Sequence, residues 1–236
     1  MTPRTSTPAK AFRGHGMEGA VAKWYAAQTK KSLDDFKTLA RRVAEQLRPQ
    51  SSVLELAPGP GYFAIELAKL GSYKITGLDI SQTFVAIASA NSAKENVAVE
   101  FRRGNASAMP FASESFDFLL CRAAFKNFAQ PQQALDEIYR VLRPGGKALI
   151  IDLRRDASKE SISQAVDARH LGTLNALIIK LIFRFMLLKR AYSKSELEHM
   201  IAQTQFRTAL IDQNLLGFEI TLCKTRSAAL ADPLLA

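Results

Sequence analysis

The sequence predicts an α/β protein built on a doubly wound, mostly parallel sheet. The prediction rests on short apolar runs that alternate with segments of helical spacing, and on a glycine-rich turn after one of those runs. The apolar run 53–56 is interrupted by a single carboxylate, Glu55, and is typical of a strand buried on both faces. The turn 57–61 follows it, and helical spacing resumes over 62–70. Such a strand, turn and helix N-terminus bring backbone N–H groups close to a bound small molecule.

Composition and length indicate one globular domain. At 236 residues, with a hydrophobic share of 47% and a charged share of 23%, the chain is long enough for a single core over 17–226. We expect 1–16 to be a mobile basic tail and 227–236 a second tail. With only two cysteines and no apolar run of about 18 residues, we expect a cytoplasmic protein without a disulfide framework or a membrane-spanning helix. The net charge of +10 suits an anionic partner such as lipid, nucleic acid or an acidic substrate, or a generally basic solvated surface.

The glycine turn is compatible with two cofactors. Residues 59–64 satisfy the pattern G-x-G-x-x-G/A of dinucleotide-binding turns. Glu55 argues against a dinucleotide, because a carboxylate beside the turn repels a pyrophosphate. It suits a ligand with an ammonium group, and S-adenosylmethionine carries an ammonium, a sulfonium and no phosphate. The charge therefore favours S-adenosylmethionine; the alternative is an ordinary strand–helix turn with a solvated glutamate.

Two helices are expected ahead of this strand, within 17–48. Ala20, Val21, Trp24 and Tyr25 form an apolar stripe on the first, and a second stripe follows over 33–47. We expect the first helix to fold over the cofactor cleft with Tyr25 pointing in. The alternative is that Trp24 and Tyr25 are simply packed in the core.

Polar residues follow two of the later strands. A strand over 74–78 ends at Asp79, and this interval from the glycine turn suits a carboxylate that binds ribose hydroxyls, in nicotinamide and S-adenosylmethionine enzymes alike. Asn105 lies in the loop after the strand 97–102, where its side-chain oxygen is expected to accept from an adenine amino group. The remaining elements are expected in the order helix from Ser81, strand 116–121, helix 134–142, stop 143–146 and strand 147–153.

These motifs together resemble a known family. The turn ELAPGPG, the strand end LDIS, the loop GNASAMPF and the run YRVLRPGGKALIIDL are similar, in order and spacing over 53–153, to class I S-adenosylmethionine-dependent methyltransferases. FKNF and PQQALDEIYRVLRPGG are most similar to the ubiquinone/menaquinone-biosynthesis C-methyltransferase type and its small-molecule relatives. The resemblance implies a Rossmann-like sheet of seven strands that ends in an antiparallel hairpin. The alternating runs 207–212 and 218–224 agree with it.

The resemblance also implies the roles of individual residues. It places Glu55, Ala57, Gly59 and Gly61 around the methionine part of the cofactor, Asp79 and Ile80 at the ribose and adenine, Asn105 and Ala106 at the adenine edge, and Cys121 beside the methionine moiety. Ala57 replaces a usual glycine, for which we expect a backbone conformation with negative φ to suffice. Asn105 replaces a usual aspartate, so its hydrogen bond to adenine would be uncharged and weaker.

A helical insertion over 154–192 is expected to choose the substrate. Helices are predicted at 157–171 and 174–188, and a capping box at Ser193 starts the helix that returns to the sheet. Leu181 and Phe185 lie on a wide apolar face of the second helix. We favour a lid over an apolar substrate; a helix lying on a membrane or at a dimer interface, and plain core packing, are the alternatives.

The predicted chemistry is displacement of a methyl group from sulfonium by a carbon, oxygen or nitrogen atom of a small apolar or aromatic molecule. No metal is expected, since no cluster with ligand spacing appears. His170 and Tyr25 are the candidates for a base, and Phe125, Asn127, Leu181 and Phe185 for substrate contacts. The protein is expected to be a monomer or homodimer. Three rivals remain: a nucleic-acid methyltransferase, a protein that binds the cofactor without methyl transfer, and a nicotinamide dehydrogenase.

Overall fold

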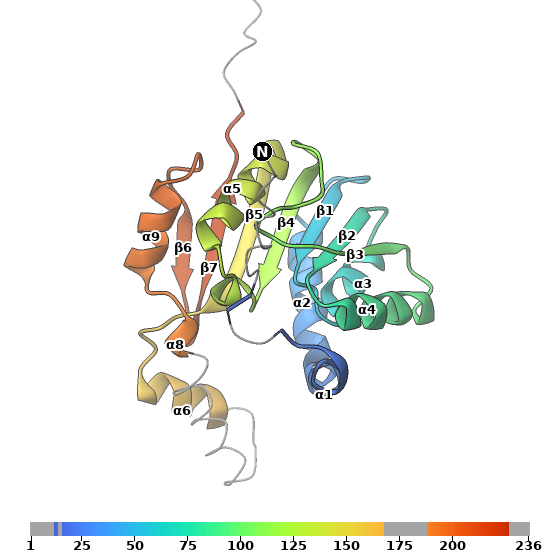
Figure 1. Cartoon of the computed structure of the whole chain (residues 1–236), viewed down its shortest axis with the longest axis horizontal. Coiled ribbons are helices and arrows are strands. Elements are labelled where there is room, and N and C mark those ends of the chain that lie inside the picture. The colour runs from blue at the N-terminus through green and yellow to red at the C-terminus, as the bar shows by residue number, and fades with distance from the viewer. Residues whose placement is uncertain (1–11, 14–15, 168–187, 227–236) are drawn as a thin grey trace, which may run out of the picture.

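The computed structural model describes residues 12, 13, 16–167 and 188–226 of the chain. They form one seven-stranded sheet with helices against both faces (Figure 1). The strand order is β3-β2-β1-β4-β5-β7-β6. Strands β1 to β5 run parallel, and β7 is antiparallel to both of its neighbours, β5 and β6. The predicted doubly wound α/β fold with a closing antiparallel hairpin is confirmed.

The elements alternate along the chain as the motifs predict. The strands are β1 (Ser52–Leu56), β2 (Lys74–Asp79), β3 (Val99–Arg103), β4 (Phe116–Arg122), β5 (Leu142–Leu153), β6 (Leu210–Gln213) and β7 (Gly217–Cys223). The helices, with two short 3-10 helices, are α1 (Gly19–Thr29), η1 (Lys30–Ser32), α2 (Leu33–Ala44), α3 (Tyr62–Ala68), α4 (Gln82–Lys94), η2 (Phe125–Asn127), α5 (Pro131–Val141), α6 (Lys159–Asp167), α8 (Leu188–Arg190) and α9 (Lys194–Ala202). The chain moves outward from β1 to β3 and then returns to β4, so the sheet changes direction between β1 and β4. In open α/β sheets, ligands bind at this switch point, beyond the carboxyl ends of the strands.

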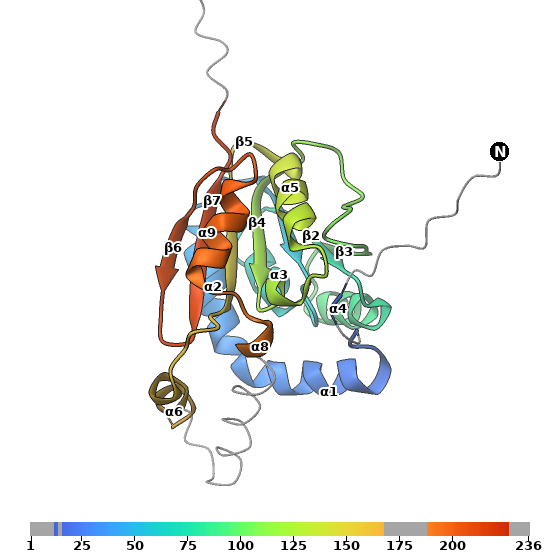
Figure 2. The same cartoon turned by 60° about the vertical axis from the view of Figure 1, so that its left-hand side comes forward.

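Two apolar clusters lie on the two faces of the sheet. One packs side chains of α5 and α9 on the strands, and the other packs side chains of α2 and α3 on the opposite face (Figure 2). Successive strand residues alternate between them: Val53 belongs to the α2/α3 cluster, whereas Leu54 and Leu56 belong to the α5/α9 cluster. Glu55 therefore shares the α2/α3 face with Val53.

Two local predictions differ from the structure. The stop 143–146 lies within β5. Leu142 of β5 pairs with Phe116 of β4, and after a register shift the pairing resumes between Lys147 and Phe118. Gly145 takes φ +83° there, so these residues interrupt the ladder as an irregularity rather than separate two elements. The apolar stripe predicted on α1 is wrong: Trp24 is 64% exposed and Val21 58% exposed. The helix is buried through Ala22 and Ala26 instead, because small side chains allow it to lie close to its neighbours.

The segment before α1 also differs from the expected free tail. Phe12 forms an isolated antiparallel bridge with Phe128, and the Arg13 N–H donates to the carbonyl of Asn127 at 2.8 Å. The guanidinium of Arg13 lies over the ring of Tyr192, 5.3 Å from its centroid. These described residues therefore pack against the domain.

The insertion is described only at its ends. α6 falls within the first predicted helix, 157–171, and α8 begins at the last residue of the second, 174–188. His170, Leu181 and Phe185 lie outside the described residues. The predicted capping box of α9 is confirmed: Ser193 Oγ accepts from the Glu196 N–H, and Glu196 Oε2 accepts from the Ser193 N–H. In the described part of the chain, no helix has both the length and the apolar character needed to cross a bilayer.

Candidate cofactor-binding site

A cleft opens at the switch point, beyond the carboxyl ends of β1, β2 and β4. Its volume is about 970 Å³, including solvent at its open side, and its walls are mostly apolar with a few polar groups. The predicted site residues that line it are Tyr25, Glu55, Ala57, Gly59, Asp79, Ile80, Asn105, Ala106 and Asn127.

Glu55 is the buried acid of this cleft. Its side chain is only 3% exposed, and Oε2 accepts from the Ala64 N–H at 3.2 Å in the first turn of α3. Burial raises its pKa to about 8, against the opposing effects of this hydrogen bond and of Arg122. The carboxyl group lies beside the turn and shares the cleft lining with Gly59. An ammonium group beside this carboxyl would favour its ionised form, so the site suits a cationic ligand.

The glycine turn adopts left-handed backbone conformations at alternate residues. Ala57 takes φ +52°, Gly59 φ +54° and Gly61 φ +80°. The expectation that Ala57 keeps a negative φ is therefore wrong, and an L-residue stands in a conformation that favours glycine. Gly61 does not line the cleft: a Cβ there would come within 2.7 Å of Phe101 and 2.9 Å of Ala88. Its role is to allow α3 and α4 to pack closely beneath the turn.

Asp79 ties this turn to the end of β2. Its side chain is 4% exposed; Oδ2 accepts from the Gly59 N–H at 3.0 Å and Oδ1 accepts from the Ser81 N–H at 2.9 Å. Burial raises its pKa, and these hydrogen bonds act in the opposite direction. Each carboxylate oxygen has a further lone pair that suits a ligand hydroxyl. The same side chain thus shapes the turn and presents acceptors at the cleft.

Asn105 lies in the cleft wall, within a loop tied to α5. Its Oδ1 accepts from the Ser107 N–H at 2.9 Å, so part of its accepting capacity serves its own loop. Glu137 accepts from the Met109 N–H at 2.6 Å, and Arg140 donates to the carbonyl of Phe111 at 2.8 Å. The loop is therefore held from α5, while the other lone pair of Asn105 Oδ1 stays available for adenine.

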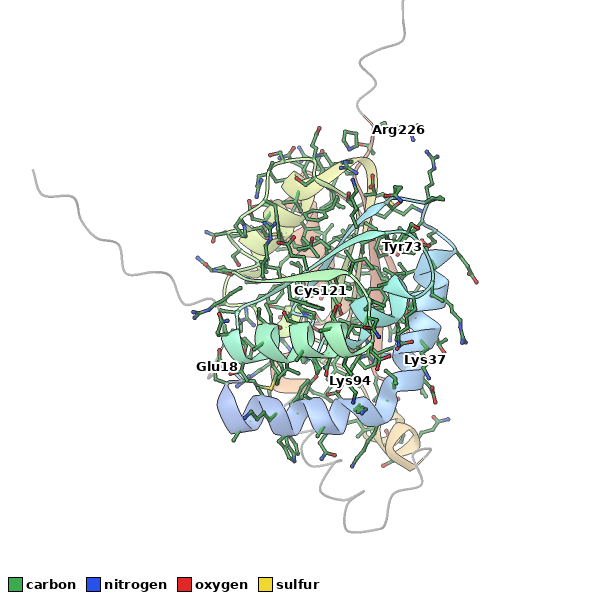
Figure 3. All side chains as sticks on the ribbon, turned by 90° about the vertical axis from the view of Figure 1, so that its right-hand side faces the viewer. Glu18, Lys37, Tyr73, Lys94, Cys121 and Arg226 are labelled. Atoms are coloured by element: carbon green, nitrogen blue, oxygen red, sulfur yellow. The ribbon has the colours of Figure 1, made fainter. Side chains whose placement is uncertain are left out.

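Helix α1 borders the cleft, and hydrogen bonds from α4 to Glu18 hold its N-terminal end. Tyr25 lines the cleft, lies edge-on to Phe84 with the ring centroids 5.8 Å apart, and is the group nearest to a Cβ added at Gly59, at 3.9 Å. Glu18 precedes α1 and accepts from the N–H groups of Gln82 and Thr83, both at 3.0 Å. Figure 3 shows Glu18 where the ends of α1 and α4 meet. The structure thus places Tyr25 at the cleft, as predicted.

The structure does not bring every predicted residue to the cleft. Cys121 is fully buried in the α5/α9 cluster, inside the ribbon in Figure 3, and burial raises the pKa of its thiol. Phe125 is 1% exposed and packs against the rings of Phe128 and Tyr192. Neither side chain contacts the cleft, so their placement does not support the predicted ligand contacts. Within the described residues, no group of three or more His, Cys, Asp or Glu side chains is arranged to hold a metal ion.

Further cleft residues were not anticipated from the sequence. Among them are Phe12, Met17, Thr29, Phe36, Phe84 and Arg122. Arg122 carried a usable signal, because a charged residue directly after a buried parallel strand lies at the ligand edge of the sheet. Phe12 carried none, since only its long-range pairing with Phe128 brings it there.

Comparisons with known proteins agree with this geometry. Residues 54–150 match the family model described as Methyltransferase domain. A demethylmenaquinone methyltransferase of Chlorobaculum parvum is 38% identical over 113 residues, which cover 48% of this chain and 45% of that protein. A ubiquinone/menaquinone biosynthesis C-methyltransferase of Blochmanniella floridana is 35% identical over 111 residues, covering 45% and 44%. This chain thus spans about half the length of the curated relatives it matches.

Solved structures share the fold over most of the chain. A Methanococcus maripaludis protein, to which S-adenosyl-L-methionine-dependent methyl transfer is ascribed, has a TM-score of 0.72 at 20% identity and covers 92% of this chain and 98% of its own. A SAM-dependent methyltransferase from Aquifex aeolicus has a TM-score of 0.59 at 16% identity, covering 82% and 98%.

The fold and the comparisons define the class of this domain. Residues 54–150 match a methyltransferase domain, and the fold is that of solved S-adenosylmethionine-dependent methyltransferases, in agreement with the class I type that the sequence motifs predict. Within that class, its similarity is to quinone-biosynthesis methyltransferases, which confirms the resemblance noted from the motifs.

Proposed function

We propose that this protein transfers the methyl group of S-adenosylmethionine to a carbon atom of a small aromatic acceptor of the quinol type. The observation that carries the proposal is the buried carboxyl group of Glu55 beneath the glycine turn, because it suits an ammonium and disfavours a pyrophosphate. The antiparallel strand β7 adds support, since a classical dinucleotide-binding sheet is parallel throughout. The names of the relatives support a quinone-like acceptor and a carbon nucleophile.

The residues of the cleft fit this cofactor by their chemistry. Glu55 would hold the ammonium group, and Asp79 would accept from the ribose hydroxyls. When bound, S-adenosylmethionine supplies a methyl group on a positively charged sulfur, which an acceptor carbon displaces. The contribution of the chain is therefore to align the acceptor and exclude water, which the mostly apolar walls favour.

Proton removal from the acceptor needs few protein groups. The acidic hydroxyl of a quinol requires only a weak base, and its phenolate makes the ring carbon nucleophilic; the ring proton leaves after methylation, when aromaticity is restored. Tyr25 faces the cleft from α1. His170, the other candidate, lies outside the described residues and stays a prediction. The lid over an apolar acceptor, with Leu181 and Phe185, stays a prediction for the same reason.

Incubation with methyl-deuterated S-adenosylmethionine and a reduced naphthoquinone that lacks a ring methyl tests the proposal. We expect one equivalent of S-adenosylhomocysteine for each deuterated methyl group in the product, with the label on a ring carbon by NMR. Label on oxygen would contradict the carbon assignment. Binding of the cofactor without S-adenosylhomocysteine formation from any quinol or phenol would contradict methyl transfer to this acceptor class, and thermal stabilisation by NAD alone would contradict the cofactor.

A further inference from the structure

Arg122 is the last residue of β4 and lines the cleft with a half-buried side chain. Glu55 pairs with Leu120 in the parallel ladder between β1 and β4. Because strand side chains alternate, Arg122 lies on the same face as Leu120 and Glu55, two residues nearer the carboxyl edge. The cleft therefore contains one acidic and one basic side chain on the same face of neighbouring strands.

Among the described residues, the guanidinium of Arg122 forms no ion pair with a carboxylate. It lies over the ring of Phe36, 4.4 Å from the centroid, so the aromatic ring holds its flat face. In contrast to Arg140, which pairs with Glu137, and Arg143, which pairs with Asp117, it makes no hydrogen bond or ion pair with any part of the chain that the structure describes. Stacking leaves the five N–H donors at the edge of the guanidinium available. A donor group in this position suits a planar anion such as a carboxylate.

An acidic and a basic side chain on the same face of neighbouring strands match one chemical group in particular. An α-amino acid carries its ammonium and its carboxylate on the same carbon atom. We propose that Glu55 and Arg122 together bind the amino-acid end of the cofactor, with Glu55 on the ammonium and Arg122 on the carboxylate. This inference rests on the proposed function, and it assigns to Arg122 the selection of nucleosides that carry a complete amino acid.

The electrostatics of the cleft agree with this pairing. Arg122 lowers the pKa of Glu55 against the larger effect of burial, so the two side chains interact across the cleft. A zwitterion presents a charge of opposite sign to each of them. The zwitterion therefore gives both Glu55 and Arg122 a partner of opposite charge and adds no net charge to a desolvated site. A ligand with an ammonium group alone would leave Arg122 without a partner and would add a positive charge.

Calorimetric titration with three nucleosides tests the inference. They are S-adenosylhomocysteine, its decarboxylated analogue, which keeps the amine, and 5′-methylthioadenosine, which lacks both groups. We expect Arg122→Gln to weaken binding of S-adenosylhomocysteine about 10- to 100-fold, the range for loss of charge-assisted hydrogen bonds. Affinity for the other two nucleosides should stay within about twofold, so the preference of the wild type for the carboxylate disappears. Arg122→Lys, which keeps the charge without the planar fork, should give an intermediate loss.

The control is Arg41→Gln, an exposed arginine of α2 outside the cleft that changes the net charge equally. It should leave all three affinities unchanged, which separates a local contact from long-range attraction. Retained binding of 5′-methylthioadenosine by Arg122→Gln shows that the variant is folded. Equal affinity of the wild type and Arg122→Gln for S-adenosylhomocysteine would overturn the inference and leave the proposed function intact. Failure of the wild type to bind S-adenosylhomocysteine would overturn both.

Discussion

Ala57 occupies an unfavourable backbone position in the lining of the cleft. Its φ of +52° lies in the left-handed region, where a Cβ is crowded by the following carbonyl. Sequence reasoning recognised the substitution for a usual glycine but not its conformation. The conformation follows from the turn itself, which must bring the Ala57 N–H to the carbonyl of Leu78 at 2.8 Å while the chain reverses.

We therefore expect Ala57→Gly to stabilise the protein by about 1 kcal/mol, because it removes the left-handed strain of an L-residue. Urea unfolding followed by circular dichroism measures the change. Ala86→Gly is the matched control: it replaces an exposed residue in the middle of α4 and should cost about 1 kcal/mol. A loss of stability in both variants would show that φ at Ala57 is not strained in solution.

Glu55 makes the stability of the cofactor-free protein depend on pH. Its pKa is about 8 in the folded protein, against an ordinary value of 4.5. Between these values the unfolded chain has lost the proton and the folded chain keeps it. The free energy of unfolding therefore falls as pH rises through this range, by at most about 1.4 kcal/mol per pH unit from this group.

We expect the melting temperature of the wild type, relative to Glu55→Gln, to fall from about pH 5 to about pH 8. Saturating S-adenosylhomocysteine should flatten the slope, because its ammonium favours the ionised carboxylate. Differential scanning calorimetry at matched ionic strength measures both effects. Parallel curves for the two proteins without cofactor would show that Glu55 is ionised in the folded state at low pH.

At the scale of elements, the N-terminus of α4 is capped by Ser81 and is also bonded to Glu18, which precedes α1. Ser81 Oγ accepts from the Phe84 N–H at 3.1 Å, as predicted for the cap, and Glu18 takes the two preceding N–H groups from outside the helix. The pKa of Glu18 is lowered, chiefly by its hydrogen bond with the Thr83 hydroxyl. The cap therefore serves as the anchor that holds α1 and Tyr25 over the cleft.

Glu18→Ala should loosen this anchor. We expect a loss of about 0.5–2 kcal/mol in stability, the usual cost of a lost helix cap, together with faster amide exchange along α1 and weaker cofactor binding. Hydrogen exchange and calorimetric titration measure the two effects. Lys23→Ala, on the exposed side of α1, is the control and should change neither. Unchanged exchange in Glu18→Ala would show that α1 is held by its apolar contacts alone.

The elements themselves were predictable where local chemistry decides them. The glycine turn, the Ser81 cap and the Ser193 capping box depend on neighbouring residues, and each appears where it was predicted. Which face of α1 is buried was not predictable. Trp24 and Val21 share one face of the helix, but in the structure that face is exposed to solvent. The face that a helix buries depends on its neighbours: α1 contacts α4, and the side chains that it buries are Ala22 and Ala26.

At the scale of the molecule, a buried ion pair joins η2 to the end of β5, where β5 pairs with the antiparallel strand β7. Lys126 Nζ lies 2.7 Å from Asp152 Oδ1, with both side chains nearly inaccessible, and Asp152 stands opposite Phe218 of β7. Lys126 also donates to the carbonyl of Ala123 at 2.7 Å, in the segment that lines the cleft. The pair fixes η2, and hence Asn127, against the end of β5.

Asp152→Asn should cost about 3–5 kcal/mol, because it leaves the Lys126 ammonium buried without a compensating charge. The double variant Asp152→Asn, Lys126→Met should recover much of this loss, since it removes the uncompensated charge. Chemical unfolding of the two single variants and the double variant measures the coupling. Additive losses would indicate that water compensates the ammonium and that the pair does not fix η2.

The sequence by itself determined the order of the elements, the class of the fold and the acids at the ends of β1 and β2. These follow from periodicity, turn chemistry and strand-end position, which depend on residues close together in the chain. Only the tertiary structure decided that Cys121 and Phe125 face the core, that Ala57 is left-handed, and that Arg122 and Phe12 border the cleft. Those properties depend on which face of a strand or helix meets a distant segment, and the free energy of that packing is not contained in any local pattern of residues.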